Sequence, residues 1–289
     1  MKKQLEGALL IVSATFLYGL IGVFSRFAGI NLFALVFYKE ALAGFFFFLI
    51  FLFYRKNIEK LKMNWKTAKF FLPYGFVVAF TEVTFLGAYL NTTLPNAAFL
   101  NGLTPLLVVV LSFFFLKERV DSKTLFSLII GMAGVGFIVG ADLFGILKEK
   151  NLLGDVLALV SAVAYAAFII YSRERAKRKV DIYYSVFWAY ALAALFLLPF
   201  NLAYGTFVIP PESIIWIALL AFVCTNIAFI LFCKGFEYID ASRGSVIALA
   251  EQLFVAINAF IFFGEGLGPL GVVGAVLIVS SVFLAEMKR

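Results

Sequence analysis

Long stretches of uncharged residues constrain the fold of this chain more than any other feature. A helix that crosses the hydrocarbon core of a bilayer needs about 20 consecutive, mostly apolar residues. Ten stretches are close to that length, and short segments, most of them charged, separate them. They cover residues 7–25, 31–54, 70–90, 95–116, 124–141, 156–172, 182–204, 213–233, 244–263 and 267–285, and three of them are interrupted by charges, at Lys39-Glu40, Glu82 and Glu251. The alternation of apolar and polar residues typical of membrane β-strands is missing, so the sequence predicts an all-α integral membrane protein with ten transmembrane helices.

The composition agrees with a lipid environment. Of the 289 residues, 64% are hydrophobic and 14% are charged, against about 45–50% apolar and about 25% charged in soluble domains. Cys224 and Cys233 fall half a turn out of phase on one helix, so they are not expected to form a disulfide. The first stretch follows Met1 without a small-residue cleavage pattern and is therefore expected to be a span.

The Lys and Arg residues in the connecting segments indicate how the chain is oriented. With the N-terminus placed inside, 20 of them fall on the inner side and three on the outer side, and Lys39 lies within a span. Cytoplasmic loops of membrane proteins carry this kind of excess. We therefore expect a multi-pass protein of the cell (inner) membrane with both termini in the cytoplasm.

The sequence matches itself without gaps when it is shifted by 147 residues. Apolar matches are weak evidence in such a sequence, but several polar and glycine matches share this register. These pairs are Gly7 with Gly154, Tyr18 with Tyr165, Ser25-Arg26 with Ser172-Arg173, and Glu118 with Glu265. The shift predicts two related units, residues 5–141 and 152–286.

Each unit holds five predicted helices, and this odd number has a consequence for topology. The second unit must enter the membrane from the side opposite to the first, which gives an inverted repeat. Inverted repeats build a central site near the bilayer midplane that either side can reach. Two similar halves also supply two states of similar energy, which a carrier needs.

Two copies of a longer pattern resemble a known family. The first copy is Thr104-Pro105, Lys117-Glu118-Arg119, Gly131 and Gly134, and the second is Glu251-Gln252, Gly264-Glu265-Gly266 and Gly274. The pattern resembles the drug/metabolite transporter superfamily, specifically its EamA-type ten-helix members. Gln252 departs from it, because the family usually has Pro there. The resemblance implies a secondary transporter that moves a small metabolite, such as an amino acid or a related compound, in the export direction by alternating access through a central cavity.

Ionisable residues deep in a span cost about 2.5–3.5 kcal/mol each on insertion scales, so each is a functional candidate. Lys39 and Glu82 lie at similar depth, about 12 Å from the outer ends of their helices, and we expect them to pair. Glu82 either binds a substrate amine or a proton and exchanges partners with Lys39, or forms a static ion pair. Glu40, next to Lys39, is a further intramembrane charge.

Glu251 and Asn258 form a polar stripe on one face of the ninth predicted helix. This stripe favours a cavity lining, although hydrogen bonds between helices would explain it as well. Asn101 and Asn226 are substrate-binding candidates on the same reasoning. Tyr18 and Tyr165 are related by the repeat, have small neighbours and are expected either to line the cavity or simply to pack.

Glu118 and Glu265 precede the next predicted helix by a few residues. We expect them to be structural, each meeting the free N–H groups and the positive dipole end of that helix. Arg26 and Arg173 lie at helix ends, where long side chains are expected to reach toward the interface.

The sequence leaves some alternatives open. It has no phosphate-binding loop, no His and no metal-ligand pattern, so we expect no cofactor, metal or catalytic residue. The partners expected are a small-molecule substrate, the bilayer, protons and a second copy of the chain, with no nucleic acid. Proton coupling and passive uniport are equally allowed. The main rival is an intramembrane enzyme acting on a lipid or prenyl substrate, and a membrane-embedded receptor or structural subunit is a third possibility.

Overall fold

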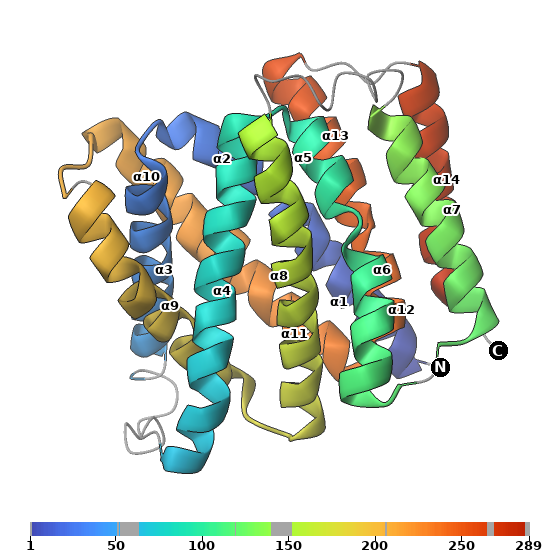
Figure 1. Ribbon diagram of the computed structural model, residues 1–289, viewed down its shortest axis with the longest axis horizontal. Helices are drawn as coiled ribbons and strands as arrows, with labels where there is room; N and C mark the ends of the chain where they lie inside the picture. The colour runs from blue at the N-terminus through green and yellow to red at the C-terminus, as the bar shows by residue number, and fades with distance from the viewer. Residues whose placement is uncertain are drawn as a thin grey trace.

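The computed structural model describes residues 2–50, 52, 64–118, 120–139, 152–205, 207–264 and 269–286, and all regular structure in these ranges is helical (Figure 1). The helices of the first half are α1 (Lys2–Tyr18), α2 (Ile21–Ala28), α3 (Leu32–Ile50), α4 (Trp65–Asn91), α5 (Leu94–Asn101), α6 (Thr104–Leu111) and α7 (Ser122–Val139). Those of the second half are α8 (Leu152–Lys177), α9 (Ile182–Tyr204), α10 (Pro211–Leu219), α11 (Ala228–Tyr238), α12 (Ala241–Ala248), α13 (Ala250–Phe263) and α14 (Pro269–Glu286). Two π-helical segments, η3 (Ser112–Leu116) and η6 (Leu220–Ile227), join the series.

The length and composition of these helices suit a membrane. Eight helical stretches in the described residues are long and apolar enough to cross a bilayer, and two shorter apolar helices, Ser122–Phe137 and Pro269–Ala285, accompany them. Each of the ten stretches singled out in the sequence overlaps one of these ten helices. Large apolar side chains such as Phe113, Phe114 and Phe115 are exposed on the outside, as expected where the solvent is hydrocarbon.

The 147-residue shift also relates the helix boundaries of the two halves. Leu94 and Ala241 begin α5 and α12, and Ser122 and Pro269 begin α7 and α14, each pair at the same repeat position. The interruption between α5 and α6 has its counterpart at Leu249, between α12 and α13. The two halves therefore share these helix starts and this break, although the interruption between α1 and α2 has no counterpart in the continuous α8.

The helix pairs that pack together follow a two-fold pattern. Contact between α4 and α8 is matched by contact between α11 and α1, which are their partners under the shift. Contacts of α3 with α9 and of α7 with α14 each join a helix to its own counterpart. In Figure 1, α1 rises from the end of the bundle where α14 finishes, whereas α8 descends toward that end, so related helices run in opposite directions.

Glycines allow the close approach of α7 and α14. A Cβ atom built on Gly134 would lie 2.8 Å from the carbonyl oxygen of Gly274 and 2.9 Å from the backbone nitrogen of Ile278. A Cβ atom on Gly131 would lie 2.5 Å from Leu249 and 2.8 Å from Ser281. Small residues at helix contacts are typical of membrane proteins, where packing drives association.

Replacing Gly134 with Ala should destabilise the protein by about 1–3 kcal/mol, because the added methyl group meets immovable backbone atoms. Gly136 lies on the same helix, and a Cβ atom there would contact only Phe99, at 3.8 Å. G136A is therefore the matched control and should leave the thermal midpoint of the detergent-solubilised protein nearly unchanged. Equal midpoints for the two variants would contradict the packing argument.

Candidate functional site

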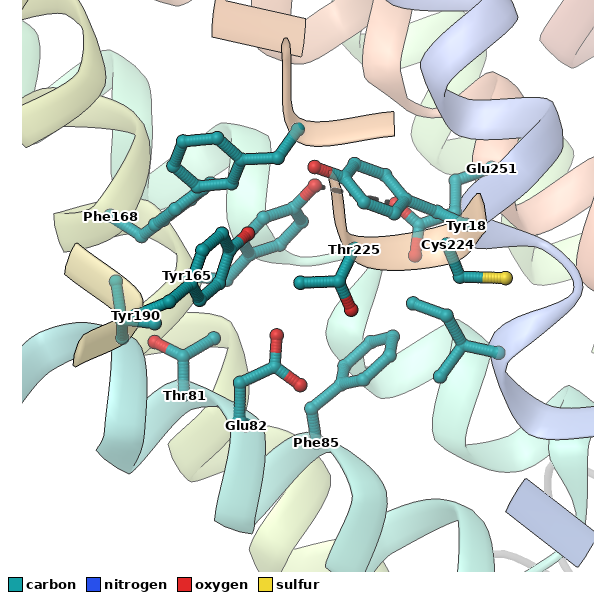
Figure 2. Close-up of a pocket in the computed structure, with 13 residues that line it drawn as sticks. Tyr18, Thr81, Glu82, Phe85, Tyr165, Phe168, Tyr190, Cys224, Thr225 and Glu251 are labelled. Carbon is teal, nitrogen blue, oxygen red and sulfur yellow. Dashed lines mark hydrogen bonds between the residues drawn. The ribbon is translucent and has the colours of Figure 1, made fainter. Parts of the chain in front are cut away.

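A cavity lies among helices of both halves. Its volume is about 40 Å³, well below the roughly 300–1,000 Å³ of small-molecule sites, so in this conformation it has room for only about three water molecules. The lining residues are Tyr18, Ile21, Val78, Thr81, Glu82, Phe85, Tyr165, Phe168, Tyr190, Cys224, Thr225, Phe229 and Glu251 (Figure 2).

Many of the lining residues are related by the repeat. Four pairs separated by 147 positions both reach the cavity: Tyr18 with Tyr165, Ile21 with Phe168, Val78 with Thr225, and Glu82 with Phe229. A local two-fold axis that relates the halves therefore passes through or beside this space. The two tyrosines that the sequence singled out line the cavity, as one of their two interpretations predicted.

Glu82 enters the cavity from the middle of α4. The helix begins with a capping box in which the Asn64 side chain accepts from the Thr67 N–H at 2.9 Å and the Asn64 N–H donates to Thr67 Oγ1 at 3.0 Å. Glu82 Oε2 accepts a hydrogen bond from Lys39 Nζ at 2.5 Å. The pairing of Lys39 with Glu82, expected from their similar depths, is confirmed.

A second carboxylate shares the same lysine. Lys39 Nζ lies 2.9 Å from Glu40 Oε1, so two carboxylates flank one ammonium group. Lys39 and Glu40 are 1% and 0% exposed, whereas Glu82 is 20% exposed. Glu82 thus forms the accessible edge of a buried ion cluster, which we define as Lys39, Glu40 and Glu82.

Glu251 enters the cavity from the first turn of α13, directly after the break at Leu249. A carboxylate in a first helical turn is favoured by the helix dipole. Its Oε2 accepts from the hydroxyl of Tyr165 at 3.4 Å (Figure 2), and the residue is 2% exposed. The break in the helix and the repeat-related tyrosine together position this second acid.

Aromatic rings form much of the cavity wall. Phe168 stacks on Tyr165 with ring centroids 5.6 Å apart, and Phe229 contacts Phe168 and Tyr190 edge-on at 5.3 and 5.1 Å. Phe85 lies 6.5 Å from Tyr165. These contacts join rings from α4, α8, α9 and α11 into one apolar surface.

The asparagine candidates lie outside this lining. Asn258 donates to the carbonyl oxygen of Gly19 at 2.9 Å, where α1 is interrupted, and Asn226 donates to the carbonyl oxygen of Ala43 at 3.3 Å. Asn101 accepts from the hydroxyls of Thr104 and Ser161, at 3.3 Å each, and lines a smaller neighbouring cavity. These contacts favour hydrogen bonding between elements, and a role in substrate binding stays a prediction for all three.

Glu118 caps a different helix from the one expected. It was expected to meet the helix that follows it, α7, but its Oε2 accepts from the N–H of Ala241, the first residue of α12, at 2.8 Å. Glu118 Oε1 also accepts from Arg173 Nε at 2.9 Å and lies 3.1 Å from Lys177 Nζ. The structural role is right in kind, but the partner lies in the other half of the chain. Glu265 lies outside the described residues.

The Arg173 side chain, which was expected to reach toward the membrane interface, forms ion pairs within the protein. This side chain is 14% exposed and forms a second ion pair with Asp240 at 2.7 Å, besides the one with Glu118. It also donates to the carbonyl oxygen of Phe236 at 2.6 Å. Arg26, its repeat counterpart, donates to the carbonyl oxygen of Thr92 at 3.4 Å and lies 4.8 Å from the ring centre of Phe263. Carboxylates and carbonyls are within reach, so these side chains bond inward.

Six lining residues that matter for the cavity were missed by sequence reasoning: Thr81, Phe85, Phe168, Tyr190, Thr225 and Phe229. For Phe229 a signal existed, because the 147-residue shift places it opposite Glu82. Phe85 and Phe168 are hidden among 37 phenylalanines. Thr225 and Cys224 lie in the π-helical segment η6, and such segments often occur at functional sites. Within the described ranges, no group of three or more His, Cys, Asp or Glu residues could hold a metal ion.

Comparison with known proteins identifies the class. The model of the EamA-like transporter family matches the chain twice, at residues 5–140 and 152–287. The chain therefore belongs to the EamA-like transporter family. It is a multi-pass membrane protein of a family of transporters and not an enzyme.

Curated relatives and a solved structure agree with this membership. The chain is 26% identical over 291 residues to the pseudopaline exporter CntI of Pseudomonas aeruginosa, covering 98% of this chain and 97% of that protein. It is 29% identical over 205 residues to an uncharacterized transporter of Archaeoglobus fulgidus, covering 71% and 72% of the two chains. A crystal structure with 20% sequence identity superposes with a TM-score of 0.78 over 96% of each chain, which shows the same fold.

Removing Lys39 should destabilise the protein far more than neutralising Glu82. K39M leaves Glu40 and Glu82 without their shared cation and should cost about 3–5 kcal/mol, the range for breaking a buried pair from one side. E82Q leaves Lys39 paired with Glu40 and should cost much less. Thermal unfolding of both variants in the same detergent measures the order, and an E82Q loss equal to that of K39M would contradict the described geometry.

Proposed function

We propose that this protein is a secondary transporter that moves a small metabolite by alternating access, with ten spans in two inverted five-helix repeats, residues 5–141 and 152–286. The observation that carries the proposal is the cavity itself, which repeat-related residues from both halves line. A site on the axis between two similar halves can be exposed to either side by rocking one half against the other. The strong bias of Lys and Arg supports cytoplasmic termini and the inner membrane.

Contacts between the halves support a conformation closed at one end. Glu118 of the first half contacts Arg173 and Ala241 of the second, at the end of the bundle where α8 finishes. In the proposed orientation this is the cytoplasmic end. These charged contacts have to break when the cavity opens inward, so they define one of the two states that alternating access requires.

The proposed cargo is a small amine metabolite, an amino acid or a related compound, moved in the export direction. The candidate binding residues are Glu82, Lys39 and Glu251 with Tyr18 and Tyr165. The relative CntI is named an exporter of pseudopaline, which supports the direction proposed here. Glu82 and Glu251 are also the groups that would carry protons, and uniport without protons fits the cavity as well. A homodimer is a further part of the proposal.

The inverted repeat predicts opposite labelling of related positions. Ser122 and Pro269 are exposed and begin α7 and α14 at the same repeat position. In a background that lacks Cys224 and Cys233, Ser122→Cys should react with a membrane-impermeant maleimide only from the cytoplasmic side. Pro269→Cys should react only from the outer side, in intact cells. Labelling of both from one side would refute the inverted topology.

The transport proposal predicts that E82Q loses substrate-driven counterflow in proteoliposomes by about tenfold or more, because a charge-assisted contact with the cargo is lost. Glu212 is exposed at the start of α10, away from the cavity, so E212Q is the matched control and should transport like the parent protein. Undiminished counterflow in E82Q would remove Glu82 from the proposed mechanism. Turnover of a lipid without any flux would favour the enzyme alternative.

A further inference from the structure

The charges that face the cavity are all of one sign. Glu82 and Glu251 are its charged lining residues, and no Lys or Arg is among the lining side chains that the structure describes. Lys39 does not offset them, because it is 1% exposed and already lies between Glu40 and Glu82. The ion cluster carries a formal charge of −1 when all three groups are ionised, and Glu251 adds a second negative charge when it is ionised as well. Such a site lacks a cation.

We infer that the cavity is built for an organic cation, an amine without a free carboxylate, whose ammonium group lies between Glu82 and Glu251 and whose apolar body packs against the aromatic wall. The inference rests on the proposed transport function and narrows its cargo. It separates the two kinds of amine metabolite, since an amino acid brings its own carboxylate and a simple amine does not.

The polar groups of the cavity suit an ammonium donor. Glu82 Oε2 accepts a hydrogen bond from Lys39 Nζ, and the carboxylate points into the space that Figure 2 shows between Thr81 and Phe85. The hydroxyl oxygen of Thr81 is buried without a hydrogen-bond partner. A carboxylate and a hydroxyl oxygen at one end of the cavity both accept N–H hydrogen bonds. Burial makes such charge-assisted bonds stronger than they are in water.

The aromatic wall suits the same ligand. Tyr165, Phe168, Tyr190 and Phe229 form a continuous set of ring contacts beside the two acids. The faces of aromatic rings attract cations, and this attraction grows when both partners are out of water. The same rings also provide apolar area for the body of the ligand. An anion would meet the negative faces of these rings as well as two carboxylates.

A ligand carboxylate would find no compensating charge here. To reach Lys39 it would have to displace Glu82, which would then be a buried carboxylate without its cation. A buried charge without a partner costs far more than an imperfect hydrogen bond. A zwitterionic amino acid would therefore lose at its carboxylate what it gains at its ammonium group.

Three ligands of matched shape test the inference: phenethylamine, phenylalanine and 3-phenylpropionate, which share one ring and carry a cation, a zwitterion and an anion. Calorimetric titration of the purified protein in detergent should give phenethylamine an affinity at least about tenfold above that of phenylalanine, and no heat with the anion. E82Q and E251Q should each weaken phenethylamine binding by about tenfold or more. E212Q, the exposed control, should bind like the parent protein.

The outcomes separate this inference from the transport proposal. Phenylalanine or the anion binding as tightly as phenethylamine, or no phenethylamine binding at millimolar concentration, would overturn the inference while leaving transport of another cargo intact. Phenethylamine binding that depends on both glutamates without any counterflow in proteoliposomes would uphold the inference and overturn transport. Should a Gln variant fail to fold, the ligand series on the parent protein decides alone.

Discussion

The ion pair between Lys39 and Glu82 is the interaction on which the arrangement of the cavity depends. An ionised side chain alone in a bilayer-spanning segment is costly, so α3 and α4 have to dock in the one register that brings Nζ within 2.5 Å of Oε2. Glu40 completes the cluster on the buried side, which leaves Glu82 facing the cavity. α4 in turn packs on α8 and α9, and the aromatic rings of those helices become the opposite wall. The buried ammonium group of Lys39 thereby fixes the position of Glu82 and of the aromatic wall opposite it.

The scaffold is symmetric, but its chemistry is not. Under the 147-residue shift, Lys39, Glu40 and Glu82 correspond to Val186, Phe187 and Phe229, so the second half has apolar residues where the first has charges. For Glu251 the charge lies in the second half instead, because the corresponding residue of the first half is the uncharged Thr104. The repeat accounts for the shared break after α5 and α12 and for the packing pairs, and the positions at which the two copies differ account for the chemistry of the site. As a result the cavity combines a carboxylate with an aromatic wall. This combination matches a ligand with a charged end and an apolar end.

The sequence could predict local features, which depend on positions along a helix or repeat. It could not predict relational features, which depend on contacts between distant parts of the folded chain. Depth along a helix is local, and it sufficed to pair Lys39 with Glu82. The repeat register could also be found in the sequence, and the structure begins α12 and α14 at the repeat positions of α5 and α7. The partner of Glu118 is relational, because Ala241 and Arg173 come near only when the two halves are folded against each other. The hydrogen bond from Asn258 to the carbonyl oxygen of Gly19 could not be predicted for a similar reason. That carbonyl is available because α1 is interrupted there, and no proline in the sequence marks the interruption. Cavity aromatics could not be told from lipid-facing ones in a chain with 37 phenylalanines.

Repeat-related arginines make similar contacts at the two ends of the bundle, and this similarity bears on how the halves move. Arg173 donates to the carbonyl oxygen of Phe236, near the end of α11, and Arg26 donates to that of Thr92, at the end of α4. Since α4 and α10–α11 occupy the same place in the two repeats, each arginine holds the end of an equivalent span. Rocking about an axis in the membrane plane separates the halves at one end while pressing them together at the other. The two carbonyl contacts each lie within one half, but each arginine also contacts the other half, Arg173 through Glu118 and Arg26 through the ring of Phe263. Release of one of these contacts between the halves is then compatible with retention of the other.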